Sequence, residues 1–191
     1  MTTRTKVTLA VLALLTAVAV GSVLATRTHA SERAHLSQIS NEGHHVALQH
    51  GSAWRGFGLT SASLLGVRGA RAVYRLESKG GPCVGAGPAD DPGKLGTVDC
   101  PRGPFPTSQR PVLDLSVYEG ASHDSHEVSL YRAEGVAADG VASIAFLRPT
   151  GTVALRVPVN ANVYEANAVP NGPIAGLAAY DAAGKELWRS P

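Results

Sequence analysis

Turn-forming residues recur along most of this chain and limit the length of any regular element. Its 191 residues include 21 glycines and 12 prolines, spaced every few positions. Proline interrupts helices and central strands, and glycine weakens both, so the pattern favours many short strands over long helices. Hydrophobic residues make up 44% and charged residues 17% of the composition, a balance that predicts a globular core and excludes a mainly disordered chain.

The N-terminus has a different composition. Two basic residues precede an uncharged apolar run at residues 7–25, which is long enough to cross a bilayer. We expect residues 1–30 to be a signal peptide or a signal anchor, because acceptable cleavage sites end at Ala25 and Ala30. Both alternatives place the rest of the chain outside the cytoplasm, anchored by an N-terminal helix or secreted after cleavage.

Charge in the exported part is nearly balanced. The targeting segment holds three of the 17 basic residues, which leaves 14 basic against 15 acidic residues. The remaining Lys and Arg residues are scattered, whereas a nucleic-acid-binding face needs them clustered. We therefore expect no nucleic-acid partner.

A polar segment at residues 31–58 is expected to form a stalk before the folded domain. Histidines lie in this segment and in a polar turn further on, and imidazole is a common metal ligand. Metal capture is one hypothesis, but neither group has a full set of ligands at a fixed spacing. We expect solvated side chains and no bound metal or cofactor for His44, His45, His50, His123 and His126.

Hydrophobic alternation with a period of two begins at Ser63 and recurs to the C-terminus, except over residues 78–109. Such alternation is typical of half-buried strands. Three hairpins are predicted, and the turns that connect their strands lie at Gly69, at 148–151 and at 181–184. The predicted strands cover residues 64–67, 72–76, 111–118, 128–131, 141–147, 152–159, 174–180 and 185–189, with Val153, Leu155, Val157 and Val159 facing inward. Short strands at this spacing indicate an all-β antiparallel sandwich or barrel over residues 59–191, as one domain or as subdomains at 59–120 and 121–191.

The segment at residues 78–109 is rich in Gly and Pro, and we expect it to be loop except for a strand within 94–100. It contains the two cysteines, Cys83 and Cys100, which an oxidising compartment would allow to pair. Their spacing is too wide for a redox motif and too few ligands accompany them for a metal site. A structural disulfide that closes this loop is therefore predicted.

The C-terminal part resembles a known type of module. Its motifs are Asp139-Gly140-Val141, the segment from Val159 to Tyr164, and the segment from Ala179 to Gly184. They are similar to those of the immunoglobulin-like β-sandwich at the C-terminus of uncharacterised exported actinobacterial proteins. The resemblance covers about residues 60–190 and implies fold and export, but no catalytic residue.

The sequence contains no recognised catalytic motif. Ser61, Ser63 and Ser116 lack the surroundings of an activated nucleophile, and Asp114, on a predicted strand, is interpreted as a structural carboxylate. Aromatic side chains offer a possible binding surface at Trp54, Tyr164 and Trp188.

We therefore predict a non-catalytic extracytoplasmic module that binds a protein or an envelope component or has a structural role. A small envelope hydrolase is the alternative, and metal binding by the histidines is a further one.

Overall fold

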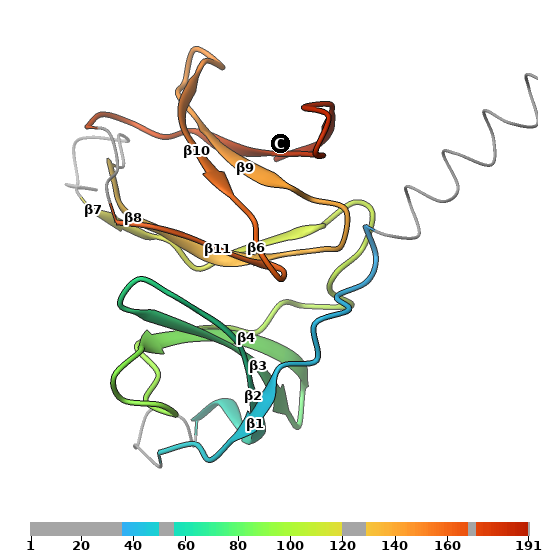
Figure 1. Cartoon of the computed structure of the whole chain (residues 1–191), viewed down its shortest axis with the longest axis vertical. Helices are drawn as coiled ribbons and strands as arrows, with labels where there is room; N and C mark the ends of the chain where they lie inside the picture. Colours follow the sequence, from blue (N-terminus) through green and yellow to red (C-terminus); the bar gives the residue numbers. More distant parts are fainter. Residues whose placement is uncertain (1–35, 50–55, 120–128, 168–170, 191) are drawn as a thin grey trace, which may run out of the picture. The chain divides into compact units, whose positions relative to one another are not determined.

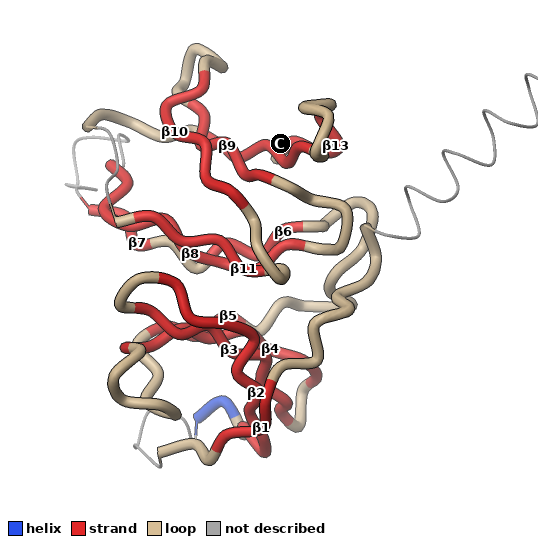
Figure 2. The backbone as a smooth tube through the Cα atoms, viewed as in Figure 1, coloured by secondary structure: helices blue, strands red, loops and turns tan. Residues whose placement is uncertain are grey.

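The computed structural model describes residues 36–49, 56–119, 129–167 and 171–190, and in these ranges it is mostly strand (Figure 2). Every strand pairing in these ranges is antiparallel, which confirms the all-β prediction. The expected N-terminal helix at residues 7–25 lies outside the described residues. No helix within them is long and apolar enough to cross a membrane.

The described strands form three sheets (Figure 1). The meander sheet has the order β1 (His44–Val46), β2 (Leu59–Arg68), β3 (Arg71–Ser78), β4 (Gly81–Pro88) and β5 (Thr97–Asp99). The middle sheet has the order β11 (Val163–Ala166), β8 (Ser129–Ala137) and β6 (Val112–Asp114), with β7 (Val117–Glu119) also paired to β8. The C-terminal sheet has the order β10 (Val153–Pro158), β9 (Ser143–Leu147), β12 (Gly176–Tyr180) and β13 (Glu186–Arg189).

The middle sheet is buried on both faces. One face packs its Leu113 and Val136 with Val73 of the meander sheet, and the other packs Val112 with Ile144 of the C-terminal sheet. Segment 111–118 keeps its predicted apolar side, and Val112 on its other side is also buried. Because β6 and β7 pair with β8, strands from before and after residue 120 share one sheet, and a subdomain boundary at that point is wrong.

The three predicted hairpins are present. In the β9–β10 turn, Gly151 N donates to Arg148 O over 2.8 Å, as expected for this Pro- and Gly-containing turn. A bulge between Val153 and Leu155 changes the side-chain direction in β10. Val153 is consequently 48% exposed, contrary to prediction, whereas Val157 is 1% exposed.

Strand β4 corrects the expectation of a loop over residues 78–109. It pairs with β3 along its whole length, despite its Gly and Pro content. The reason is close backbone packing: a Cβ at Gly87 would collide with the carbonyl of Lys94, and Gly96 N donates to Ala86 O over 2.8 Å. The glycines here permit a neighbouring segment to approach the strand. Strand β5 lies within the predicted 94–100 segment.

The expected stalk at 31–58 is part of the fold over residues 36–49, which we call the N-terminal strap. Leu36 is buried in the core, and β1 pairs with β2. The Asp139 carboxylate accepts from Ser40 N at 3.1 Å. Asn41 Nδ2 donates to carbonyls of Leu65 and Ala161, 2.7 Å from each. The strap is therefore hydrogen-bonded to residues from both the first and the second half of the chain.

Candidate functional site

The main polar site begins with a row of three residues across the middle sheet. Asp114 of β6 and Tyr164 of β11 are both in register with Gly135 of β8, which lies between them. Without a side chain at Gly135, the Tyr164 ring crosses β8, and its hydroxyl donates to Asp114 Oδ1 over 2.9 Å. Tyr164 is fully buried, and its ring makes an edge contact with Phe146.

Ser116 interrupts the edge strand and completes the Asp114 environment. Its hydroxyl donates to Asp114 Oδ1, and its oxygen accepts from Glu134 N at 3.0 Å. Side chains of Asp and Ser compete in this way with backbone pairing. The predicted strand 111–118 is for this reason divided into β6 and β7.

Tyr118 supplies a third hydroxyl donor to the carboxylate. Its hydroxyl donates to Asp114 Oδ2 over 2.5 Å, and 37% of the residue is exposed. Burial, and then the negative charge of Asp114, raise the pKa of Tyr118 far above its usual value. The same two causes raise the pKa of Tyr164. Both phenols therefore stay protonated and act as donors at physiological pH.

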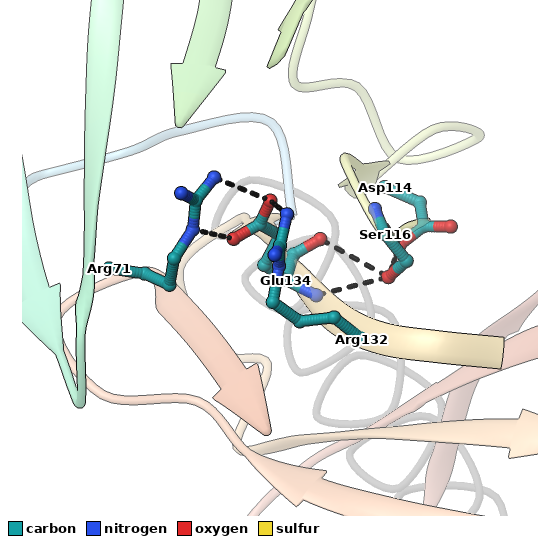
Figure 3. Close-up of polar contacts among 5 residues, drawn as sticks. All are labelled: Arg71, Asp114, Ser116, Arg132 and Glu134. Carbon is teal, nitrogen blue, oxygen red and sulfur yellow. Dashed lines mark hydrogen bonds and ion pairs between the residues drawn. The ribbon is translucent and has the colours of Figure 1, made fainter. Parts of the chain in front are cut away.

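A buried ion cluster lies on the opposite face of the same sheet (Figure 3). Glu134 is 0% exposed, and its two oxygens accept from Arg71 Nε at 2.8 Å and from Arg71 Nη2 at 3.1 Å. Arg132 Nη2 donates to Oε1 over 3.0 Å. The bidentate bond from β3 to β8 joins the meander sheet to the middle sheet.

Glu165 lies beside this cluster, in register with Glu134. Its Oε1 is buried without a hydrogen-bond partner among the described residues. Burial, followed by repulsion from Glu134, raises the pKa of Glu165, although Arg132 and Arg71 act in the opposite direction. The Glu165 carboxylate is therefore in an unfavourable environment for a charge.

An open groove of about 370 Å³ lies next to the Asp114 cluster. The Tyr118 ring forms one side of it. Tyr118 is held in place by its bond to Asp114, whose other oxygen binds Ser116 and Tyr164. The groove is lined mostly by apolar atoms of Tyr118, Ile174, Ala175, Gly176, Leu177 and Ser190.

The disulfide is the predicted site feature that the structure confirms. Cys83 on β4 and Cys100 just after β5 are bonded, with their Cα atoms 4.2 Å apart. The bond fastens the end of β5 to β4. It does not close a loop of irregular structure as expected, because β4 is a strand.

The three aromatic residues expected on a binding surface do not form one in the described part of the chain. Tyr164 is inside the fold, so its assignment to a surface is wrong. Trp188 packs partly against the core, and its Nε1 donates to Gln109 O over 2.8 Å. Trp54 lies outside the described residues.

The histidines are divided between described and undescribed parts of the chain. His44 and His45 are exposed on β1. His50, His123 and His126 lie outside the described residues. Within the described ranges, no group of three His, Cys, Asp or Glu side chains is arranged to hold a metal ion.

Two features of the site were not predicted from the sequence. The alternation placed Asp114, Ser116 and Tyr118 on one side of a strand, but it did not predict their hydrogen bonds to one another. Glu134 was not identified as a site residue, and nothing in the sequence paired it with Arg71, 63 residues away.

Comparisons with known protein families, with curated proteins and with solved structures find no match to this chain. The immunoglobulin-like resemblance stays a prediction.

Proposed function

We propose that this chain is a non-catalytic, extracytoplasmic module that binds a protein partner through the groove beside Tyr118. The observation that carries the proposal is the fixed position of an exposed aromatic ring. Three hydroxyl groups converge on Asp114, and one of them orients Tyr118 at the edge of an apolar groove. A rigid aromatic side chain loses little entropy when it binds, which makes such a residue a suitable anchor.

The groove chemistry favours an apolar protein side chain over a sugar. A sugar needs several polar partners, but the Tyr118 hydroxyl already donates to Asp114. The Ser190 hydroxyl oxygen accepts from Leu177 N at 2.9 Å. The rest of the lining is largely apolar, so the matching partner is a segment with a projecting apolar residue.

Export is the second part of the proposal. The disulfide supports an oxidising compartment, and the apolar run at residues 7–25 supports passage through a membrane. An immunoglobulin-like module, attached to the membrane or released from it, is consistent with the all-β antiparallel structure. The proposed topology is an extracytoplasmic C-terminus.

A C-terminal fusion to alkaline phosphatase, which folds only after export, tests the topology. We expect an active fusion, and an inactive one when residues 7–25 are deleted. Equal activity with and without these residues would contradict export through this segment.

Photo-crosslinking in the producing cell tests the partner. A benzophenone amino acid at Ala175, which is exposed and lines the groove, should give an adduct of one discrete mass. The same probe at Tyr131, which is 55% exposed, serves as the matched control. Tyr118→Ala should abolish the adduct while the variant still unfolds cooperatively. Identical adducts from both positions, or an adduct unaffected by Tyr118→Ala, would exclude the groove.

One contact favours the alternative of a small hydrolase. The Ser116 hydroxyl donates to the Asp114 carboxylate, an arrangement also found in activated nucleophiles. However, the Ser116 oxygen also accepts from Glu134 N, and Asp114 has other donors. A fluorophosphonate probe that labels the wild type but not Ser116→Ala would establish the hydrolase and refute a non-catalytic role.

A further inference from the structure

A second cavity, of about 120 Å³, lies where three distant segments meet. The N-terminal strap contributes Ile39, the meander sheet contributes Leu65 and Val84, and the segment before β6 contributes Phe105. These side chains give the cavity an apolar wall. Arg75 is the charged residue among the described ones that line it.

Arg75 has donors available for an anion. Its side chain is 46% exposed, and its Nε donates to Glu77 Oε1 over 3.2 Å. A guanidinium has five N–H groups in a planar fork, which matches the two oxygens of a carboxylate. Among the described residues, Glu77 is the one side chain bonded to this guanidinium.

We propose that this cavity binds a short straight-chain fatty acid, with its alkyl end against the apolar wall and its carboxylate on Arg75. The inference does not depend on the Tyr118 groove, because the lining residues of the two sites differ. A carboxylate fits better than a phosphate monoester. Glu77 beside Arg75 already supplies one negative charge, and a phosphate group would add nearly two more.

The cavity volume limits the chain length of the ligand. An apolar protein cavity of about 150 Å³ accepts benzene, which has six carbon atoms. A cavity of about 120 Å³ therefore accommodates about four to five carbon atoms beyond the carboxylate. Pentanoate and hexanoate are the expected best fits among the straight-chain acids.

Saturation-transfer NMR on the full chain in lipid nanodiscs measures this binding directly. The probes are acetate, butanoate, pentanoate, hexanoate and octanoate. We expect affinity to rise about fourfold per added methylene, the factor for moving one such group out of water, and to level off after hexanoate. Empty nanodiscs of the same lipid composition measure partition into the bilayer, which is subtracted.

Two variants test the ionic contact, and the series of chain lengths tests the apolar one. Arg75→Gln should weaken hexanoate binding at least fivefold, because a charge-assisted hydrogen bond is lost at an exposed position. Glu77→Gln should strengthen binding about twofold, since it removes a competing carboxylate. No saturation transfer, equal binding by the wild type and Arg75→Gln, or an affinity that does not depend on chain length would overturn the proposal.

Discussion

Tyr164 crosses Gly135, and its hydroxyl oxygen occupies space that a Cβ at position 135 would need. The missing side chain of one residue thus allows the other to reach Asp114 on the far side of β8. A Cβ at Gly135 would also collide with the carbonyl of Leu113. The glycine is therefore required by two contacts, of which one involves rigid backbone.

Gly135→Ala should destabilise the fold by about 1–3 kcal/mol, the usual cost of overpacking. Urea denaturation measures the loss. In the Tyr164→Ala background Gly135→Ala should still be destabilising, because the Leu113 carbonyl oxygen remains in the way. A neutral Gly135→Ala in either background would contradict this account.

Tyr164→Phe should cost about 1.5–3 kcal/mol of unfolding free energy, because a hydrogen bond to a charged group is lost while the ring stays. Urea denaturation also measures this loss, and an unchanged stability would show that the bond to Asp114 contributes nothing.

Removing the acid of the buried ion cluster should have a large effect. Glu134→Ala leaves the charges of Arg71 and Arg132 without their carboxylate and should cost about 3–5 kcal/mol. The exposed pair Arg75 and Glu77 provides the matched control, and Glu77→Ala should cost less than about 1 kcal/mol. Equal losses of unfolding free energy in the two variants would show that burial of the cluster contributes nothing.

Glu165 gives a pH-dependent prediction. Its pKa is raised in the folded state, so its contribution to stability is fully present below the unfolded pKa and is lost as pH rises through the folded pKa. Glu165→Gln, which mimics the protonated acid, should therefore melt at a higher temperature than the wild type at pH 7. The two melting temperatures should converge at pH 3. A variant that is less stable at pH 7 would show that the ionised carboxylate has favourable partners.

The disulfide should contribute a measurable part of the stability. Cys83 and Cys100 are 17 positions apart, and closing a loop of this size is worth about 3 kcal/mol in the chain-entropy model. The double variant Cys83→Ala/Cys100→Ala should lose that amount in denaturant titrations. The wild type measured with reductant should approach the variant, and a reductant effect on the variant itself would indicate another cause.

Strand β10 offers a comparison of two valines. Val157 is 1% exposed and Val153 is 48% exposed. Val157→Ala should cost about 1.5–3 kcal/mol, the value of burying such a side chain, and Val153→Ala much less. Leu155 packs only partly on the core and should fall between them. If Val153→Ala lost more unfolding free energy than Val157→Ala, the bulge would not lie between Val153 and Leu155.

These two valines also show where prediction from the sequence ends. The alternation correctly located β10 and its turn, because pleated strands alternate whatever their surroundings. The bulge that turns Val153 outward depends on pairing with β9 and leaves no trace in the alternation. Similarly, a period of two identifies one apolar face, but not the second buried face of a middle layer.

The polar sites show the same limit. The strand that holds Asp114 was predicted correctly, and short-range spacing along it brings Asp114 to Ser116 and Tyr118. Its bond to Tyr164 spans 50 positions, and the bond between Glu134 and Arg71 spans 63. Such pairs are determined by how sheets stack, which no local pattern encodes. Strand β4 was not predicted, because a Gly-rich sequence is compatible both with a turn and with a strand that another segment approaches closely.

The N-terminal strap has a consequence for the order in which the protein folds. Ser40 leaves the ribosome early, but its partner Asp139 follows 99 positions later, and Ala161, the partner of Asn41, follows 120 positions later. Contacts between such distant positions carry a large loop-closure cost and form late. We therefore expect the strap to dock last. Until most of the chain has been synthesised, residues 36–49 therefore stay undocked.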